Sequence, residues 1–186
     1  AGILNFSTFT NNVGGEIFID QTTRDGISNS NNFINLGKIT VGENGTLEES
    51  GIANWDTFTN EASGEIIIDQ TKKDGIVNNI GTFNNSGKIT IGENEVIGGE
   101  GIGNQANFTN KASGEIIIGQ TTNNGIAVSS FGTFINETCA IVRCNGQIQN
   151  AGTFKNEGFL FSNFEGSHIG LRHSTFINTG GIQDLY

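Results

Sequence analysis

Four aspartates occupy equivalent places in two loops and are the clearest candidates for ion chemistry. Asp20 and Asp25 bound the first loop, and Asp69 and Asp74 bound the second. Carboxylates stacked between turns are ligands that Ca²⁺ accepts. However, arginine and lysine in the same loops would offset these charges, and a third copy of the loop has Gly and Asn at the two positions. We therefore favour turn-forming and capping aspartates, with calcium as the alternative and no other cofactor predicted.

The histidines and cysteines give weaker signals. His168 and His173 have no cysteine or carboxylate cluster at metal-ligand spacing beside them, so a zinc site is not predicted. Cys139 and Cys144 would lie about 16 Å apart on an extended strand, beyond the reach of a disulfide. They can bridge only if the segment bends, and otherwise we expect buried free thiols. No nucleophile elbow, phosphate-binding loop or paired acid–base site stands out, so we expect no enzymatic activity.

These residues are positioned by a repeat. Eight Phe-x-Asn triplets recur at intervals of 20 to 26 residues through the 186-residue chain. Such a period indicates a solenoid, in which each unit buries its apolar face against the next. We predict that the phenylalanines stack in the core and that the asparagines form a ladder where strands end. The predicted ladder residues are Phe9, Phe33, Phe58, Phe83, Phe108, Phe134, Phe154 and Phe176, with Asn11, Asn35, Asn60, Asn85, Asn110, Asn136, Asn156 and Asn178.

Two further motifs complete each repeat. Gly-Ile-x-Asn precedes the triplet, as at 51–54, and Gly-x-Ile-x-Ile or Val follows it, as at 87–91. Apolar and polar residues alternate in each motif, which is the pattern of a short strand with one buried face. The inward-facing residues are predicted to include Ile3, Phe9, Ile17, Phe33, Ile39, Phe58, Ile66, Phe83, Ile89, Phe108 and Ile116.

The three motifs together predict an all-β fold, a single-stranded parallel β-helix or solenoid. It should have eight turns of about 20–26 residues with three short strands per turn. We expect a right-handed coil, because parallel crossovers strongly prefer that hand. The whole chain, 1–186, is predicted to be a single domain, with regular turns over 1–125 and degenerate turns over 126–186.

The charge at one position of the repeat alternates from turn to turn. The residue after the glycine of the third motif changes sign through five consecutive turns. Stacked in register, opposite charges would lie side by side, and such neighbours contribute a few tenths of a kcal/mol each. We interpret the series as a charge ladder, with separate solvated positions as the alternative. Its members are Glu16, Lys38, Glu65, Lys88 and Glu115.

Composition limits the partners. The net charge of −10 argues against nucleic acid and anionic membranes, and no apolar run is long enough to insert into a bilayer. Proline is absent, which suits strands that need every backbone donor. Because the first motif starts at the second residue, we expect a processed chain or a piece of a larger protein.

The repeated motifs resemble the β-helix repeats of secreted bacterial surface proteins and adhesins. They are also similar in style to the Gly-Gly-Ala-Ile and Phe-x-x-Asn repeats of chlamydial polymorphic outer-membrane proteins, although the spacing here is Phe-x-Asn. The resemblance implies an extracellular or cell-surface location and a structural or adhesive role. It brings no catalytic residues.

The leading hypothesis is a non-enzymatic extracellular structural protein, either a self-assembling fibre subunit or an adhesin stalk. Its main partner would be a further copy, joined head to tail, because terminal turns expose strand edges that invite pairing. A host or environmental surface is a second possible partner. The predicted end-to-end interface comprises Ile3 and Phe9 at one end with Phe176 and Ile182 at the other.

Two alternatives remain open. One is a polysaccharide-binding or polysaccharide-active β-helix protein, which a carboxylate-lined groove with perturbed pKa values would support. The other is an ice-binding protein, suggested by outward threonines in triplets such as Thr57-Phe58-Thr59. That threonine face is interrupted by Ile34, Ile135, Lys155 and Ile177.

Overall fold

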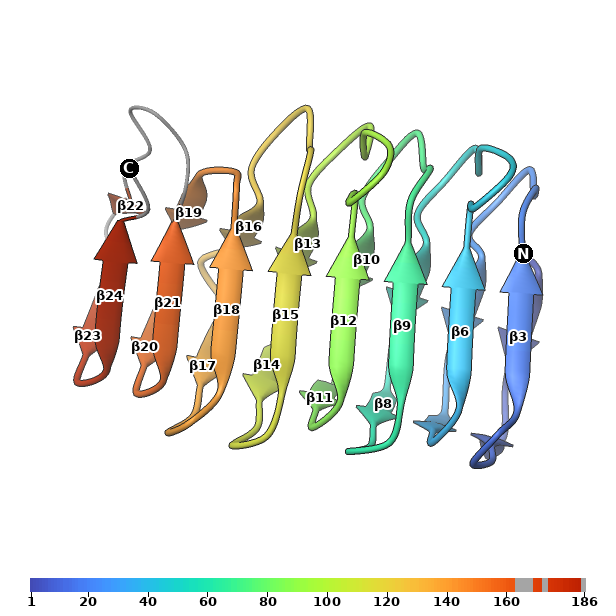
Figure 1. Cartoon of the computed structure of the whole chain (residues 1–186), viewed down its shortest axis with the longest axis horizontal. Helices are drawn as coiled ribbons and strands as arrows, with labels where there is room; N and C mark the ends of the chain where they lie inside the picture. The colour runs from blue at the N-terminus through green and yellow to red at the C-terminus, as the bar shows by residue number, and fades with distance from the viewer. Residues whose placement is uncertain (163–168, 172–173, 185–186) are drawn as a thin grey trace.

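The computed structural model describes residues 1–162, 169–171 and 174–184, which form three parallel sheets of eight strands each (Figure 1). The chain visits the sheets in a fixed order on every turn, so it makes about seven full turns from β1 to β22. In Figure 1 the nearest strands run upward while the chain advances from right to left, which is a right-handed coil. The predicted β-solenoid is therefore confirmed, and no helix occurs in the described ranges.

The first sheet is built from the Gly-Ile-x-Asn motifs. Each strand has three residues, and equivalent residues pair across turns, as Ile76 does with Ile102 and Asn78 with Asn104. The first and third residues face the interior and the middle residue faces outward. The strands are β1 (Ile3–Asn5), β4 (Ile27–Asn29), β7 (Ile52–Asn54), β10 (Ile76–Asn78), β13 (Ile102–Asn104), β16 (Ile126–Val128), β19 (Ile148–Asn150) and β22 (Ile169–Leu171).

The second sheet carries the Phe-x-Asn triplets. Its phenylalanine rings stack along the rod, with centroids of neighbouring rings 4.6 to 5.7 Å apart. This spacing follows from the separation of paired strands, about 4.8 Å. The strands are β2 (Phe9–Asn11), β5 (Asn32–Asn35), β8 (Thr57–Asn60), β11 (Thr82–Asn85), β14 (Asn107–Asn110), β17 (Thr133–Asn136), β20 (Thr153–Asn156) and β23 (Thr175–Asn178).

The third sheet is made by the Gly-x-Ile-x-Ile motifs. Its register continues into the degenerate turns, where Ile116 pairs with Val142 and Val142 with Leu160. The aliphatic character of the inward positions is therefore sufficient to keep the pairing when the glycines and isoleucines are lost. The strands are β3 (Glu16–Ile19), β6 (Lys38–Val41), β9 (Glu65–Ile68), β12 (Lys88–Ile91), β15 (Glu115–Ile118), β18 (Ile141–Cys144), β21 (Phe159–Ser162) and β24 (Gly181–Asp184).

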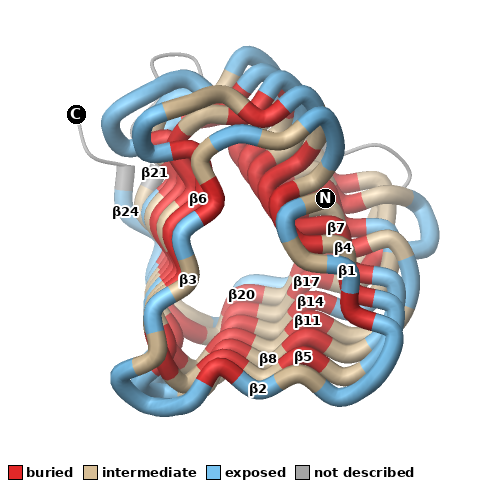
Figure 2. Tube along the Cα trace, turned by 90° about the vertical axis from the view of Figure 1, so that its right-hand side faces the viewer, coloured by how far each residue is buried: buried red, intermediate tan, exposed pale blue. Residues whose placement is uncertain are grey.

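The core is the triangular interior that the three sheets enclose (Figure 2). The six inner phenylalanines, from Phe33 to Phe154, are fully buried. Full burial of such a side chain stabilises by roughly 1.5–3 kcal/mol. Ile3, Phe9 and Ile17 also face inward, but they are only partly buried because the first turn has a neighbour on one side only.

Two core residues come from loops rather than from the three motifs. Leu47 and Ile97 lie in the long loops after β6 and β12, and both are fully buried. Each loop turns inward and forms an isolated parallel bridge, Leu47 with Thr71 and Ile97 with Thr121. Neither residue was predicted to be buried, because a single apolar residue in a polar loop gives no periodic signal.

Candidate functional site

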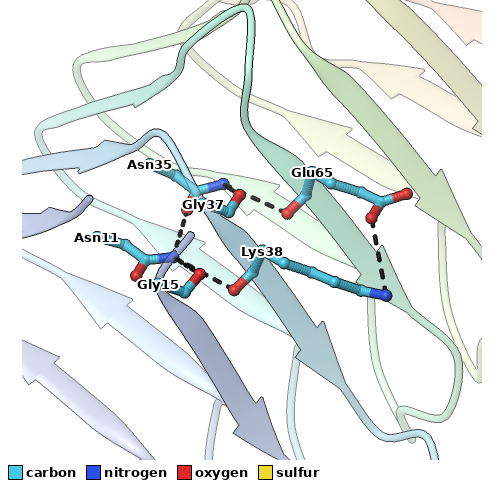
Figure 3. A network of polar contacts seen from close by, with 6 residues as sticks. All are labelled: Asn11, Gly15, Asn35, Gly37, Lys38 and Glu65. Carbon is cyan, nitrogen blue, oxygen red and sulfur yellow. Dashed lines mark hydrogen bonds and ion pairs between the residues drawn. The ribbon is translucent and has the colours of Figure 1, made fainter. Parts of the chain in front are cut away.

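The predicted asparagine ladder closes the corner between the second and third sheets (Figure 3). Asn11 Nδ2 donates to Asn35 Oδ1 at 2.8 Å, and it also lies 3.2 Å from the carbonyl oxygens of Gly15 and Lys38. The same amide-to-amide bond repeats at 2.8 Å on every step as far as Asn178. The column therefore pairs its own buried amides and gives a second hydrogen bond to carbonyls such as that of Gly15, which also accepts from Lys38 N at 2.8 Å.

This ladder accommodates two loop lengths. Asn60 reaches the carbonyl of Gly64, four residues on, whereas Asn85 reaches that of Gly87, two residues on. Both acceptors are the glycine that precedes a strand of the third sheet. The two extra residues in alternate turns therefore bulge outward without disturbing the buried hydrogen bonds.

A second asparagine ladder lies at the corner between the first and second sheets. It uses the asparagine of Gly-Ile-x-Asn, and its amide-to-amide distances are 2.7 to 2.9 Å from Asn5 to Asn104. Val128 replaces asparagine in the next turn, so Asn104 keeps only the bonds to backbone carbonyls, those of Ala106 and Thr133, that the earlier members such as Asn54 also make. The recurring Gly-Ile-x-Asn motif carried the signal for this ladder, but only the Phe-x-Asn column was predicted to form one.

The five predicted charge-ladder residues lie next to one another in register, from Glu16 opposite Lys38 to Lys88 opposite Glu115. Among the described residues, one pair of the series is in ion-pair range, with Lys38 Nζ 3.7 Å from Glu65 Oε2 (Figure 3). These side chains are partly exposed, and exposed pairs contribute about 0–1 kcal/mol. The alternation thus avoids like-charge neighbours more than it builds a continuous network.

Two of the four predicted aspartates, Asp20 and Asp69, each join a turn to the loop of the next turn. Asp20 accepts hydrogen bonds from the backbone and side-chain amides of Asn44 at 3.1 and 3.3 Å. Asp69 makes the equivalent bonds to Asn94 at 3.3 and 3.2 Å. In both cases an Asp-Gln-Thr loop pairs with the Gly-Glu-Asn loop of the next turn.

The other two aspartates cap backbone groups. Asp25 Oδ1 accepts from Ser50 N at 3.1 Å, and Asp74 Oδ1 accepts from Glu100 N at 2.8 Å. Within the described ranges, no group of three or more His, Cys, Asp or Glu residues is arranged to hold a metal ion. The histidines considered for zinc, His168 and His173, lie outside the described residues.

The two cysteines are both free, and they differ from the expectation of buried thiols in one respect. Cys144 is buried, and burial raises the pKa of its thiol to about 12. Cys139 is exposed, because it lies in the turn before β18 rather than on the strand. It adopts a left-handed conformation with φ of 68°, the region that Gly14 occupies, with φ of 77°, at the corresponding corner of the first turn.

A cavity of about 780 Å³ opens where the loops between the third and first sheets become shorter. These loops have ten residues after β12, seven after β15 and three after β18. The short loop leaves the side of its longer neighbour uncovered. We call this cavity the polar notch, and it is lined by Val96, Glu100, residues 119–124 and residues 145–147.

A second cavity of about 260 Å³ lies on the outer face of the first sheet and shares Glu100 with the polar notch. We call it the sheet groove, and its floor includes Val77, Gly103 and Ala127. A Cβ atom on Gly103 would lie 3.1 Å from Glu100 Oε2 and 3.2 Å from Asp74 Oδ2. The two carboxylates therefore converge over this glycine, and the absence of a side chain there keeps the groove open.

Burial raises the pKa values of both the Asp74 and the Glu100 carboxyl groups, and the negative charge of Asp74 adds to the effect on Glu100. Hydrogen bonds hold both carboxylates in place. Glu100 N donates to Asp74 Oδ1 at 2.8 Å, and Asn124 Nδ2 donates to Glu100 Oε1 at 3.3 Å and to Gln149 Oε1 at 3.0 Å. This row of carboxyl and amide groups can exchange hydrogen bonds with a polar ligand. Asp74 was predicted to lie in a loop, and Glu100 was not predicted as a site residue.

No match was found among protein-family models, curated proteins or solved structures. The likeness to bacterial adhesin repeats therefore rests on the repeat motifs alone, and function has to be argued from the geometry. In the described part of the chain, no helix has the length and apolar character needed to cross a membrane.

Proposed function

We propose that this chain is a non-enzymatic structural rod that is extended by stacking further turns on its ends. Extension would occur either between separate copies, giving a fibre, or along one polypeptide, giving a stalk. The extracellular or cell-surface setting is the one that the resemblance to adhesin repeats implies. The observation that carries the proposal is that the two end faces of the rod complement each other.

The complementarity lies in the ladder. Within the described residues, Asn11 Oδ1 accepts no hydrogen bond, whereas Asn178 Nδ2 donates only to a carbonyl in its own turn, that of Gly180. The last turn thus presents a donor where the first presents an acceptor. The terminal strands β1, β2 and β3 each pair on one side only, as do β22, β23 and β24. Stacking last turn on first would continue all three sheets in a heterologous, open-ended contact.

Apolar residues on the end faces favour the same contact. Ile182 pairs with the buried Leu160 and therefore faces inward, yet it is 46% exposed, since β24 is the last strand of its sheet in the described part of the chain. Phe9 and Phe176 are the end members of the ring stack and are partly buried. A junction between copies would remove these surfaces from water, at about 25 cal/mol per Å² of apolar area.

Sedimentation velocity over a concentration series, with electron microscopy of the same samples, tests the fibre form. We expect linear oligomers that lengthen with concentration, and we expect Ile182→Lys to suppress them. Ile177→Lys is the matched control, since Ile177 is 40% exposed but pairs with Lys155 and faces outward. A chain that remains monomeric at all concentrations would exclude assembly of separate copies and leave stacking within one polypeptide.

The threonine face considered for ice binding is mixed in the observed register. Thr59 lies between Ile34 and Asn84, and Lys155 lies between Ile135 and Ile177. We therefore retain the structural rod as the proposed function.

A further inference from the structure

We infer that the polar notch and the sheet groove together form a binding site for a segment of an uncharged oligosaccharide. This inference is separate from the proposed rod function and does not depend on it. It rests on the chemistry of the lining, on the shape of the two cavities and on the place where they meet.

The lining offers hydrogen-bonding groups that both donate and accept. The polar notch carries the hydroxyls of Thr121 and Thr122 and the amides of Asn123, Asn124 and Gln147. Sugar hydroxyls also donate and accept, so each can pair with an amide or hydroxyl in either sense. A site that relies on such groups discriminates strongly against ligands that would leave them unpaired.

Charge argues for an uncharged ligand. No lysine or arginine lines either cavity among the described residues, so an acidic glycan or a phosphate would meet no counter-charge. The carboxylates present are Asp74 and Glu100, and each already accepts a hydrogen bond from the loop of the next turn, Asp74 from Glu100 N and Glu100 from Asn124 Nδ2. They would repel an anion, but they can accept further hydrogen bonds from ligand hydroxyls because each oxygen has two lone pairs.

The shape suits an extended chain rather than a compact molecule. The volume of the polar notch, about 780 Å³, is in the range of small-molecule sites. The sheet groove continues beyond Glu100 along the row of outward positions Val77, Gly103 and Ala127. Small apolar residues on a flat floor allow the less polar face of a sugar ring to approach, while the groups on the rim reach its hydroxyls.

The test is isothermal titration calorimetry of the intact chain with cellohexaose, laminarihexaose, xylohexaose and hexagalacturonate, each in the presence of EDTA. We expect at least one of the three neutral hexasaccharides to bind and hexagalacturonate to bind at least tenfold more weakly. In the double variant Asn123→Ala, Gln147→Ala, affinity should fall about tenfold or more, since two hydrogen bonds are lost. Asn84→Ala, on the outer face of the second sheet, is the control and should bind as the wild type does.

A second variant addresses the groove independently of the notch. Gly103→Ala places a methyl group against the Glu100 and Asp74 oxygens and should weaken binding of the same hexasaccharide at least threefold. Thermal melts establish that each variant is folded. The inference is overturned if no neutral hexasaccharide binds, if hexagalacturonate binds as tightly as the neutral ligands, or if both variants bind with wild-type affinity.

Discussion

The side-chain amide of Asn60 donates a hydrogen bond of 2.8 Å to the side-chain oxygen of Asn85, and both residues are completely buried. Asn85 in turn donates to Asn110 and to the carbonyl of Gly87. Each asparagine thus joins three turns and closes one corner. A buried amide is costly unless it is paired, so its presence at every step means that the ladder fixes the register of the coil as well as stabilising it.

Removing one ladder member should therefore destabilise strongly. We expect Asn85→Ala to lower the free energy of unfolding by about 2–4 kcal/mol. It leaves Asn110 Oδ1 buried without its donor, and it removes one of the two hydrogen bonds to the Gly87 carbonyl, which also accepts from Glu115 N. Its neighbour Asn84 faces outward, and Asn84→Ala should change stability by less than about 0.5 kcal/mol. Urea denaturation of the two variants measures the difference, and similar midpoints would contradict the role of the ladder.

The ring stack gives a second comparison within one strand. Phe83 is fully buried between Phe58 and Phe108, with ring centroids 4.7 Å away on each side. Phe83→Ala should cost ~3–5 kcal/mol, whereas Thr82→Ala, which alters an outward side chain, should fall within about 0.5 kcal/mol. The measurement is again the denaturation midpoint, and a larger effect at Thr82 would mean that the assigned register is wrong.

The left-handed conformation of Cys139 predicts a stabilising substitution. A non-glycine residue at a φ of 68° carries a conformational cost that glycine avoids. Cys139→Gly should raise stability by up to about 1 kcal/mol, although the added freedom of the unfolded chain offsets part of this gain. Cys139→Val, which is β-branched, should instead destabilise. Calorimetric melts that rank glycine below valine would contradict the backbone assignment.

The two thiols should differ in reactivity. Thiolate is the reactive form, and burial both raises the pKa of Cys144 to about 12 and blocks access to it. An aromatic disulfide reagent at pH 8 should therefore titrate one thiol in the native chain and two in denaturant. Cys139→Ser should abolish the fast native reaction, and rapid labelling that persists in this variant would show that Cys144 is accessible.

The convergent carboxylates predict a pH-dependent stability term. Because burial raises the pKa of Glu100 in the folded chain, its contribution to stability is fully present at pH values below the unfolded pKa of about 4.3. It is lost as the pH rises through the raised folded value. Glu100→Gln should thus raise the melting temperature at pH 7 and not at pH 3. The corresponding gain in the free energy of unfolding should be less than about 1 kcal/mol, because the group is half exposed.

Glu95→Gln provides the matched control for that prediction, because Glu95 is exposed and lies in the same loop. Subtracting its effect removes the general benefit of lowering the negative charge of the chain. Equal shifts for the two variants at pH 7 would mean that Glu100 has no special contribution.

Much of the architecture could be predicted because the repeat displays the register directly. The interval between Phe58 and Phe83 is one turn, so their side chains had to stack once the strands were parallel. The pairing of Asp69 with Asn94 was not predicted, because it joins adjacent turns through loops of different sequence. Whether a loop turns inward depends on packing and not on the interval of the repeat. The burial of Leu47 was therefore not predicted.

The polar notch was still harder to anticipate. It results from a difference in length between the loop at 119–125 and the loop at 145–147. No sequence motif marks such a difference. Glu100 follows two glycines in a loop and looks like an ordinary exposed acid in the sequence. Only the fold places it beside Asp74 over Gly103.

The uniform direction of the amide bonds has an electrical consequence. From Asn11 to Asn178 every side-chain N–H points toward the later turn and every oxygen toward the earlier one. The amide dipoles therefore add along the axis, with the positive end at the last turn, as peptide dipoles add in an α-helix but with the opposite sense relative to the chain. Two such rods lying side by side would be electrostatically favoured when they run antiparallel.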